Sequence, residues 1–174
     1  TDVILTPSVL MLTDANGLNE LRTVLSAGES CNSTVIQKWA QGRRFVNAYG
    51  PTESTVCATY KLCTPEDFNN ITIGMPIEGT KIYVLDDDSN PVPIGMKGEL
   101  CITSIGLARG YMNMPEQTAD KFIENTIDEN GFERIYRTSD VVRYSQNGEI
   151  RFCGRKDNQV KIRGFRIELD EAEN

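Results

Sequence analysis

The chain has 174 residues, of which 39% are hydrophobic and 25% charged, and its net charge at pH 7 is -7. This composition is typical of a soluble globular protein, and the negative charge argues against nucleic acid or an anionic membrane as the main partner. The apolar runs are too short to span a bilayer, and no signal peptide is visible. We therefore expect a cytoplasmic protein that binds no nucleic acid and no membrane.

The absence of histidine and the pattern of cysteines exclude several kinds of catalytic and metal-binding site. Histidine is absent, which excludes a Ser-His-Asp triad, a histidine metal cluster and histidine general-base catalysis from this stretch. The five cysteines are odd in number and include no Cys-x-x-Cys pair. A disulfide framework or a zinc site is therefore not expected, and reduced thiols fit a cytosolic protein.

The first seventy residues alternate apolar strands with a helix. Strands are predicted at Val3–Leu5, Thr23–Leu25 and Phe45–Asn47. Asn32 or Ser33 can cap a helix that runs to about Ala40. This order predicts a parallel sheet, in which ligands gather beyond the carboxyl ends of the strands. The segment Asn47–Glu53 follows one such end.

The second part of the chain, from residue 74 to 153, is rich in short strands separated by glycine and proline. Examples are Lys81–Leu85 and Glu99–Thr103. Pro115 opens a helix. Asn147-Gly148 suits a type I′ turn and predicts a hairpin. The pattern predicts a β-rich barrel or sandwich.

The expected fold class is therefore α/β plus β-barrel. Residues 1–73 would be the end of an α/β subdomain, 74–153 a distorted β-barrel subdomain, 154–158 a polar hinge, and 159–174 the start of a small α+β C-terminal domain. The chain begins without Met in a strand-like run and stops where a helix is starting. We expect an internal piece of a longer polypeptide.

The turn Tyr49-Gly50-Pro51-Thr52-Glu53 combines features that suit a nucleotide. Gly50 permits close approach of the backbone to a ligand, and Pro51 stiffens the turn. Tyr49 offers an aromatic face to a base. Thr52 can donate to a phosphate, and the Glu53 oxygens suit Mg²⁺. Taken alone, the segment favours an ordinary strand-to-helix loop with a capping Thr.

Three further segments carry polar groups. Asp140 follows a predicted strand, and its carboxylate can accept from both hydroxyls of a ribose. Arg155 can reach ribose or phosphate, and Lys161 can meet a developing negative charge. The alternative for Asp140 is an acid that caps a turn, and for Arg155 and Lys161 it is a solvated charged segment.

Gly106–Tyr111 lacks the ending of a phosphate-binding loop, so a structural role with Tyr111 packed inward is expected.

Together these segments resemble the adenylation domains of non-ribosomal peptide synthetases, in the adenylate-forming superfamily. The matching stretches cover nearly the whole chain and are Asn47–Glu53, Gly98–Ile102, Gly106–Tyr111, Asn113–Phe122, Tyr136–Asp140 and Gly154–Glu171. Ser139 departs from the family, which usually has Gly there. Thr103-Ser104 also replaces a more usual Gly-rich pair.

The resemblance implies activation of an amino or other carboxylic acid by ATP and Mg²⁺, followed by transfer to the phosphopantetheine of a peptidyl carrier protein among neighbouring synthetase modules. It implies catalytic roles for Thr52, Glu53 and Lys161, with Glu53 on the metal, and a hinge at Asp157. The implied nucleotide-binding residues are Gly28, Asn47, Ala48, Tyr49, Gly50, Asp140, Phe152 and Arg155.

The resemblance also places six residues around the acyl group. They are Ile4, Leu25, Ala27, Ala48, Val56 and Cys57. All are apolar, and two alanines leave volume, so we expect a large hydrophobic, aromatic acid such as phenylalanine, tyrosine or an aryl-propanoid acid. Alternatively, Ile4 and Leu25 are core residues.

Three parts of the family pattern are absent: the phosphate loop, the acid that pairs with the substrate amine, and the distal catalytic lysine. We therefore expect no adenylation by this chain alone. Two other functions stay open, namely an acyl- or aryl-CoA ligase and a non-catalytic binding or structural module of the same fold. The joint presence of Glu53, Asp140, Arg155 and Lys161 argues against the module.

Overall fold

A computed structural model describes residues 1–128, 131–157, 159–162 and 165–168. The chain divides into two compact units. Unit 1 contains Thr1–Tyr49, Thr59–Gly74 and the residues from Asp157 on, whereas unit 2 contains Gly50–Ala58 and Met75–Lys156.

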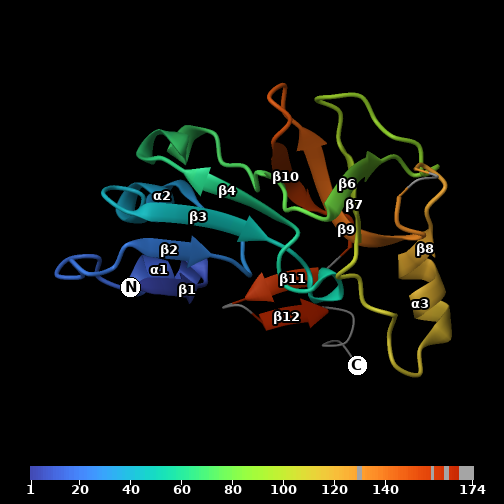
Figure 1. Ribbon diagram of the computed structural model, residues 1–174, viewed down its shortest axis with the longest axis horizontal. Coiled ribbons are helices and arrows are strands. Elements are labelled where there is room, and N and C mark those ends of the chain that lie inside the picture. The colour runs from blue at the N-terminus through green and yellow to red at the C-terminus, as the bar shows by residue number, and fades with distance from the viewer. Residues whose placement is uncertain (129–130, 158, 163–164, 169–174) are drawn as a thin grey trace. The chain divides into compact units, whose positions relative to one another are not determined.

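Unit 1 is built on a mixed sheet. Its strands β1 (Asp2–Leu5), β2 (Thr23–Ser26) and β3 (Arg44–Tyr49) run parallel, and β4 (Thr59–Cys63) pairs antiparallel with β3 (Figure 1). The parallel strands predicted from the sequence are thus confirmed. Because β2 and β3 are parallel neighbours, their carboxyl ends lie at the same edge of the sheet.

The helices α1 (Pro7–Leu12) and α2 (Ser33–Trp39) lie between the strands in the sequence, and the 3₁₀ turn η2 (Pro65–Asn69) follows β4. Asn32 caps α2, because its side-chain oxygen accepts a hydrogen bond from the Val35 N–H at 3.0 Å. The indole N–H of the buried Trp39 donates to the Leu10 carbonyl at 2.9 Å and joins α2 to α1. The core comprises Leu10, Val24, Val35, Ile36, Trp39, Ala40, Phe45 and Cys63.

Unit 2 is built on an antiparallel sheet in the order β10-β9-β7-β6, with β8 paired to the first part of β9 (Figure 1). The strands are β6 (Thr80–Leu85), β7 (Gly98–Ser104), β8 (Phe122–Glu124), β9 (Arg134–Tyr144) and β10 (Ile150–Arg155). Outside this sheet the unit contains η1 (Thr52–Ser54), β5 (Met75–Pro76) and α3 (Pro115–Lys121). Every residue of the central β7 is buried. Among the described residues this sheet is not closed, so the expected barrel is not confirmed.

The hairpin between β9 and β10 is confirmed, but its predicted turn type is wrong. A type I′ turn needs positive φ at both central residues, and of Asn147-Gly148 only Gly148 has it, at 82°. The loop is longer than two residues: Ser145 N–H donates to the Glu149 carbonyl at 2.8 Å, and Gly148 N–H donates to the Ser145 carbonyl at 3.0 Å. One glycine in the left-handed region is enough to close this loop.

After Asp157 the chain forms two short strands, β11 (Gln159–Ile162) and β12 (Phe165–Glu168), which pair antiparallel. In the ranges that the structure describes, no helix is long and apolar enough to cross a membrane.

Candidate functional site

The carboxyl ends of β2 and β3 carry two groups of predicted site residues, Ala27-Gly28 and Asn47–Tyr49. The register pairs Ser26 with Asn47, so the two groups lie at one edge of the sheet of unit 1. Asn47 is buried, and its side-chain amide donates to the Thr72 carbonyl at 2.7 Å. This contact fixes the end of β3.

The residues expected around the acyl group differ in exposure. Ala48 is buried, whereas Ile4 is 71% exposed and Val56 is 75% exposed. The exposure of Ile4 rules out a core position in unit 1, which was the alternative for this residue. Leu25 lies beside Ile4 in the sheet and is half-buried, as are Ala27 and Cys57.

The turn that begins at Gly50 folds back on itself within unit 2. A Cβ on Gly50 would lie 2.5 Å from the Val56 carbonyl oxygen and 2.7 Å from the Ala58 nitrogen. Position 50 therefore requires a glycine because the chain's own backbone passes close to it. Thr55 and Val56 both have positive φ, 57° and 71°. For residues with a branched Cβ this is strained, and such strain is concentrated at functional sites.

Glu53 lies on η1, is only 6% exposed, and is held through both its carboxylate and its backbone carbonyl. Its carboxylate accepts a hydrogen bond from the Tyr111 hydroxyl, with Oη and Oε1 2.8 Å apart. Its backbone carbonyl accepts from the Ala108 N–H at 2.8 Å. Nearby, the Thr55 hydroxyl donates to the Gly106 carbonyl at 2.6 Å. The loop Gly106–Tyr111 therefore fastens the turn that carries Glu53.

Asp140 and Arg155 form an ion pair across β9 and β10. Arg155 Nη1 donates to Asp140 Oδ1 at 2.6 Å, and the side chains are 13% and 6% exposed for Arg155 and Asp140 respectively. The structure thus brings together two predicted nucleotide-binding residues. The prediction that Asp140 follows a strand is wrong, because the residue lies within the eleven-residue β9.

A bulge explains the position of Asp140. On β7, Glu99 faces Val141 and Cys101 faces Arg137. Leu100 alone therefore stands against three residues of β9, and the middle one, Ser139, has a φ of 60°. Bulges re-aim side chains and are frequent beside active sites. The irregularity therefore lies directly beside Asp140, inside a continuous strand.

A charged cluster surrounds this bulge. The 3%-exposed Glu99 accepts hydrogen bonds from Arg137 Nη2 at 2.7 Å and from Ser139 N–H at 2.9 Å, and Lys156 Nζ lies 3.4 Å from it. Burial alone would raise the pKa of Glu99, but Arg137, Ser139 and Lys156 hold it below its ordinary value. Lys156 also pairs with Asp87 at 2.7 Å, and these carboxylates raise the pKa of Lys156.

Comparison with known proteins identifies the family. The model of a family described as AMP-binding enzyme matches residues 3–112, which include both Glu53 and Tyr111. The chain belongs to this family.

The chain is 48% identical to bacitracin synthase 3 of Bacillus licheniformis over 174 residues and 41% identical to tyrocidine synthase 1 of Brevibacillus parabrevis over 176 residues, and each match covers 100% of the chain. It is 33% identical to a solved NRPS protein containing adenylation and PCP domains, PA1221, with a TM-score of 0.89 over 99% of the chain. The chain spans only 3% of the bacitracin synthase, 16% of the tyrocidine synthase and 36% of the solved protein.

The remaining predicted site residues are less enclosed. Thr52 is exposed at the start of η1, and Phe152 is half-buried on β10 opposite Val142. Asp157 is exposed, and its carboxylate accepts from the Gln159 N–H at 3.3 Å. Lys161 lies in β11, but its side chain is outside the described residues.

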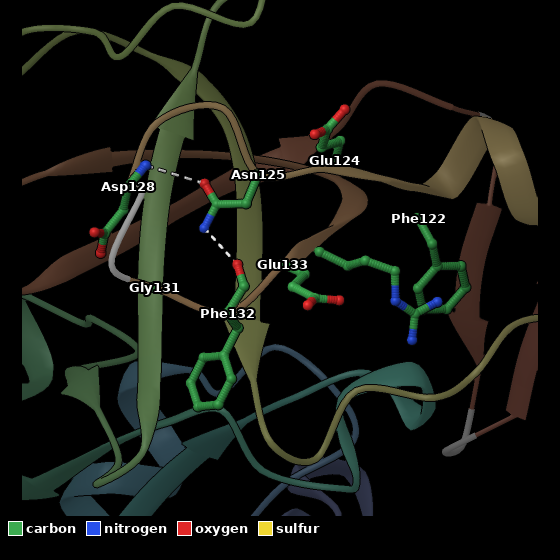
Figure 2. A pocket seen from close by; sticks show the side chains of 8 residues that line it. Phe122, Glu124, Asn125, Asp128, Gly131, Phe132 and Glu133 are labelled. Carbon is green, nitrogen blue, oxygen red and sulfur yellow. Dashed lines mark hydrogen bonds between the residues drawn. The ribbon is translucent and has the colours of Figure 1, made fainter.

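Unit 2 also has a pocket of about 540 Å³ beside β8, lined by described residues between Phe122 and Arg134 (Figure 2). In Figure 2, the Asn125 amide donates to the Phe132 carbonyl at 2.8 Å and its oxygen accepts from the Asp128 N–H at 3.2 Å. The guanidinium of Arg134 lies over the Phe122 ring, 5.5 Å from its centre. Of the predicted site residues whose side chains the structure describes, none lines this pocket.

The sequence alone did not indicate the contact of Tyr111 with Glu53 or the charged cluster around Glu99. The sequence predicts packing alone for Tyr111 and places Glu99 in a strand. Glu99 offered one signal, since a charged residue between apolar strand neighbours needs a partner when it is buried.

Proposed function

We propose that this chain is part of an adenylation domain that activates an amino or aryl acid and passes it to a carrier protein in non-ribosomal peptide synthesis. Support comes from the family match and from the solved NRPS protein that contains adenylation and PCP domains. The observation that carries the proposal is the buried carboxylate of Glu53, fastened by Tyr111 on the turn after β3.

The reaction has two steps. In the first, a carboxylate oxygen of the acid attacks the α-phosphorus of ATP, the bond to the β-phosphate breaks, and acyl-adenylate and pyrophosphate form. In the second, the phosphopantetheine thiol loses its proton and its sulfur attacks the acyl carbon, so that a thioester forms and AMP leaves. A single site that changes conformation between the steps can perform both.

Glu53 would hold Mg²⁺, and the chemistry of its environment fits that ion. Mg²⁺ prefers oxygen ligands and is usually bound by one or two carboxylates together with substrate phosphates. Glu53 supplies such oxygens in an enclosed position. When bound, the ion would neutralise charge on the phosphates of ATP. Among the described residues no group of three or more His, Cys, Asp or Glu could hold a metal by itself, so phosphate oxygens would complete the ligand set.

The remaining residues would position the nucleotide. Asp140, oriented by Arg155 at 2.6 Å, would accept from the ribose hydroxyls, and Thr52 would donate to a phosphate. The adenine would be bound by residues at the ends of β2 and β3, with Phe152 beside the nucleoside. The adenine-binding residues would be Gly28, Asn47, Ala48, Tyr49 and Gly50.

The second step would need a change at a hinge. Asp157 would be the pivot within a polar segment 154–158, between a subdomain ending at residue 153 and a small domain that begins at 159. Lys161, in β11, would act in the thioester-forming state.

The proposed substrate is a large hydrophobic, aromatic acid. This proposal relies on the apolar character of Ile4, Leu25, Ala27, Ala48, Val56 and Cys57. An Ala48→Phe variant of the complete domain should lose aromatic turnover because Ala48 is buried and cannot move a larger side chain into solvent. Undiminished turnover would refute this pocket.

The test is ATP–pyrophosphate exchange by the complete domain with a panel of amino and aryl acids. Strong exchange with one aromatic acid is expected. Exchange with small or charged acids alone would keep the reaction and reject the substrate class. No exchange with any acid would favour a non-catalytic module. Offering the acyl-adenylate to a carrier protein and to coenzyme A separates the synthetase from the CoA ligase.

A further inference from the structure

The hydroxyl of Tyr111 joins two segments that are 58 residues apart in the sequence. We infer that Tyr111 is a positioning residue, which orients the Glu53 carboxylate toward a metal-bound phosphate. This inference rests on the proposed function, in which Glu53 is the metal-binding carboxylate.

Because Glu53 is buried, its hydrogen bonds determine the orientation of its carboxylate. A carboxylate that is withdrawn from water must be satisfied by donors, and each donor restricts its rotation. Tyr111 donates to Oε1 at 2.8 Å, while Ala108 N–H donates to the backbone carbonyl of the same residue at 2.8 Å. One loop therefore fixes both the backbone and the side chain of Glu53.

Tyr111 is itself held from two sides. Its N–H donates to the Thr118 hydroxyl at 2.9 Å. Its ring meets the Phe122 ring edge-on, with centres 5.7 Å apart, and Phe122 lies 5.0 Å from Tyr136. Gly110, with a φ of 147°, brings the backbone so close to Thr118 that a Cβ would collide with it. A rigid support of this kind keeps a functional group in one orientation.

The test uses Tyr111→Phe in the complete domain, because this variant keeps the ring contacts and removes only the hydroxyl. The matched control is Tyr144→Phe, which removes the hydroxyl that donates to the Ile82 carbonyl at 2.8 Å. Isothermal titration measures binding of a non-hydrolysable ATP analogue with Mg²⁺ and with EDTA. ATP–pyrophosphate exchange, titrated with Mg²⁺, is the second readout.

For Tyr111→Phe we expect the affinity with Mg²⁺ to fall roughly 10-fold or more, as for a lost hydrogen bond to a charged group. The affinity in EDTA should stay within about twofold, and the Mg²⁺ midpoint of exchange should rise. Tyr144→Phe should change none of these. Thr118→Val, which acts one step further away, should lower the Mg²⁺-dependent affinity about fivefold, as for a neutral hydrogen bond.

Equal losses with Mg²⁺ and with EDTA would reduce Tyr111 to a packing residue and overturn the inference. Unchanged binding in Tyr111→Phe, beside a wild-type domain that binds better with Mg²⁺, would overturn it while leaving the proposed function intact. A wild-type domain that binds the analogue equally with Mg²⁺ and EDTA would overturn the inference and the metal-binding role of Glu53, whereas the absence of ATP–pyrophosphate exchange with any acid would overturn the proposed function itself.

Discussion

Replacing the buried Glu99 by Gln should destabilise the domain in a pH-dependent way. The substitution keeps the shape and the contact with Ser139 N–H, but it removes the charge that faces Arg137 and Lys156. Those two side chains are 29% and 33% exposed, so water replaces part of what they lose. Since hydrogen bonds to charged groups contribute roughly 1.5–3 kcal/mol, we expect a loss of about 2 kcal/mol at pH 7.

The pH dependence follows from the lowered pKa of Glu99. A carboxyl with a depressed folded-state pKa stabilises the native state fully above its unfolded pKa, about 4.3, and loses this contribution as the pH falls through the folded value. Urea unfolding followed by circular dichroism should give a constant difference between wild type and Glu99→Gln from pH 7 to 5, and a smaller one below pH about 4.

The exposed Glu78 supplies the control, since Glu78→Gln should change the free energy of unfolding by less than about 0.5 kcal/mol. In a double-mutant cycle with Arg137→Met, the coupling energy should be about 1–2 kcal/mol. A loss in Glu99→Gln no larger than that of the control, or one that does not vary with pH, would refute the reasoning.

Two glycines and two cysteines give further predictions, about stability and about thiol reactivity. A Cβ on Gly74 would overlap the Tyr60 carbonyl, whereas one on Gly79, at a similar φ of 75°, has no atom within 4 Å. Gly74→Ala should therefore cost more than about 3 kcal/mol in urea unfolding and Gly79→Ala only about 1 kcal/mol, and similar costs would contradict the close packing of Gly74. Burial raises the pKa of Cys63 and of Cys101 to about 12. Neither should react with iodoacetamide at pH 8 until urea unfolds the domain, as mass spectrometry can check; rapid labelling of the native state would show that these thiols are accessible.

Local signals in the sequence were sufficient for much of unit 1. The strands β1 to β3 follow from short apolar runs, and α2 follows from its cap at Asn32, because both depend on neighbours within a few residues. The β9–β10 hairpin was also predictable from Asn147-Gly148. Its turn type was not, because the loop length depends on the register of the two strands.

The arrangement around the candidate site could not be obtained in the same way. Glu99 and Arg137 are 38 residues apart, and Glu53 and Tyr111 are 58 apart. The first pair is set by the pairing of β7 with β9, and the second by the packing of a loop against η1, so neither follows from neighbouring residues. The bulge beside Asp140 depends on Ser139 in the left-handed region, where a serine is unusual and a glycine would be unstrained. Nothing in the local pattern signals it.

The hydrogen bonds and ion pairs of Lys156 limit how far the residues after Asp157 can move. Its N–H donates to the Ser139 carbonyl at 2.8 Å while its ammonium pairs with Asp87 and Glu99, so the last residue before the proposed pivot is fixed to its sheet. Lys161 comes four residues after Asp157, and an extended chain covers about 3.3–3.6 Å per residue. Whatever angle the pivot adopts, the Cα atom of Lys161 stays inside a sphere of about 14 Å radius around that of Asp157. A reaction in which the Lys161 side chain takes part must therefore occur inside that sphere or within one side-chain length of its surface.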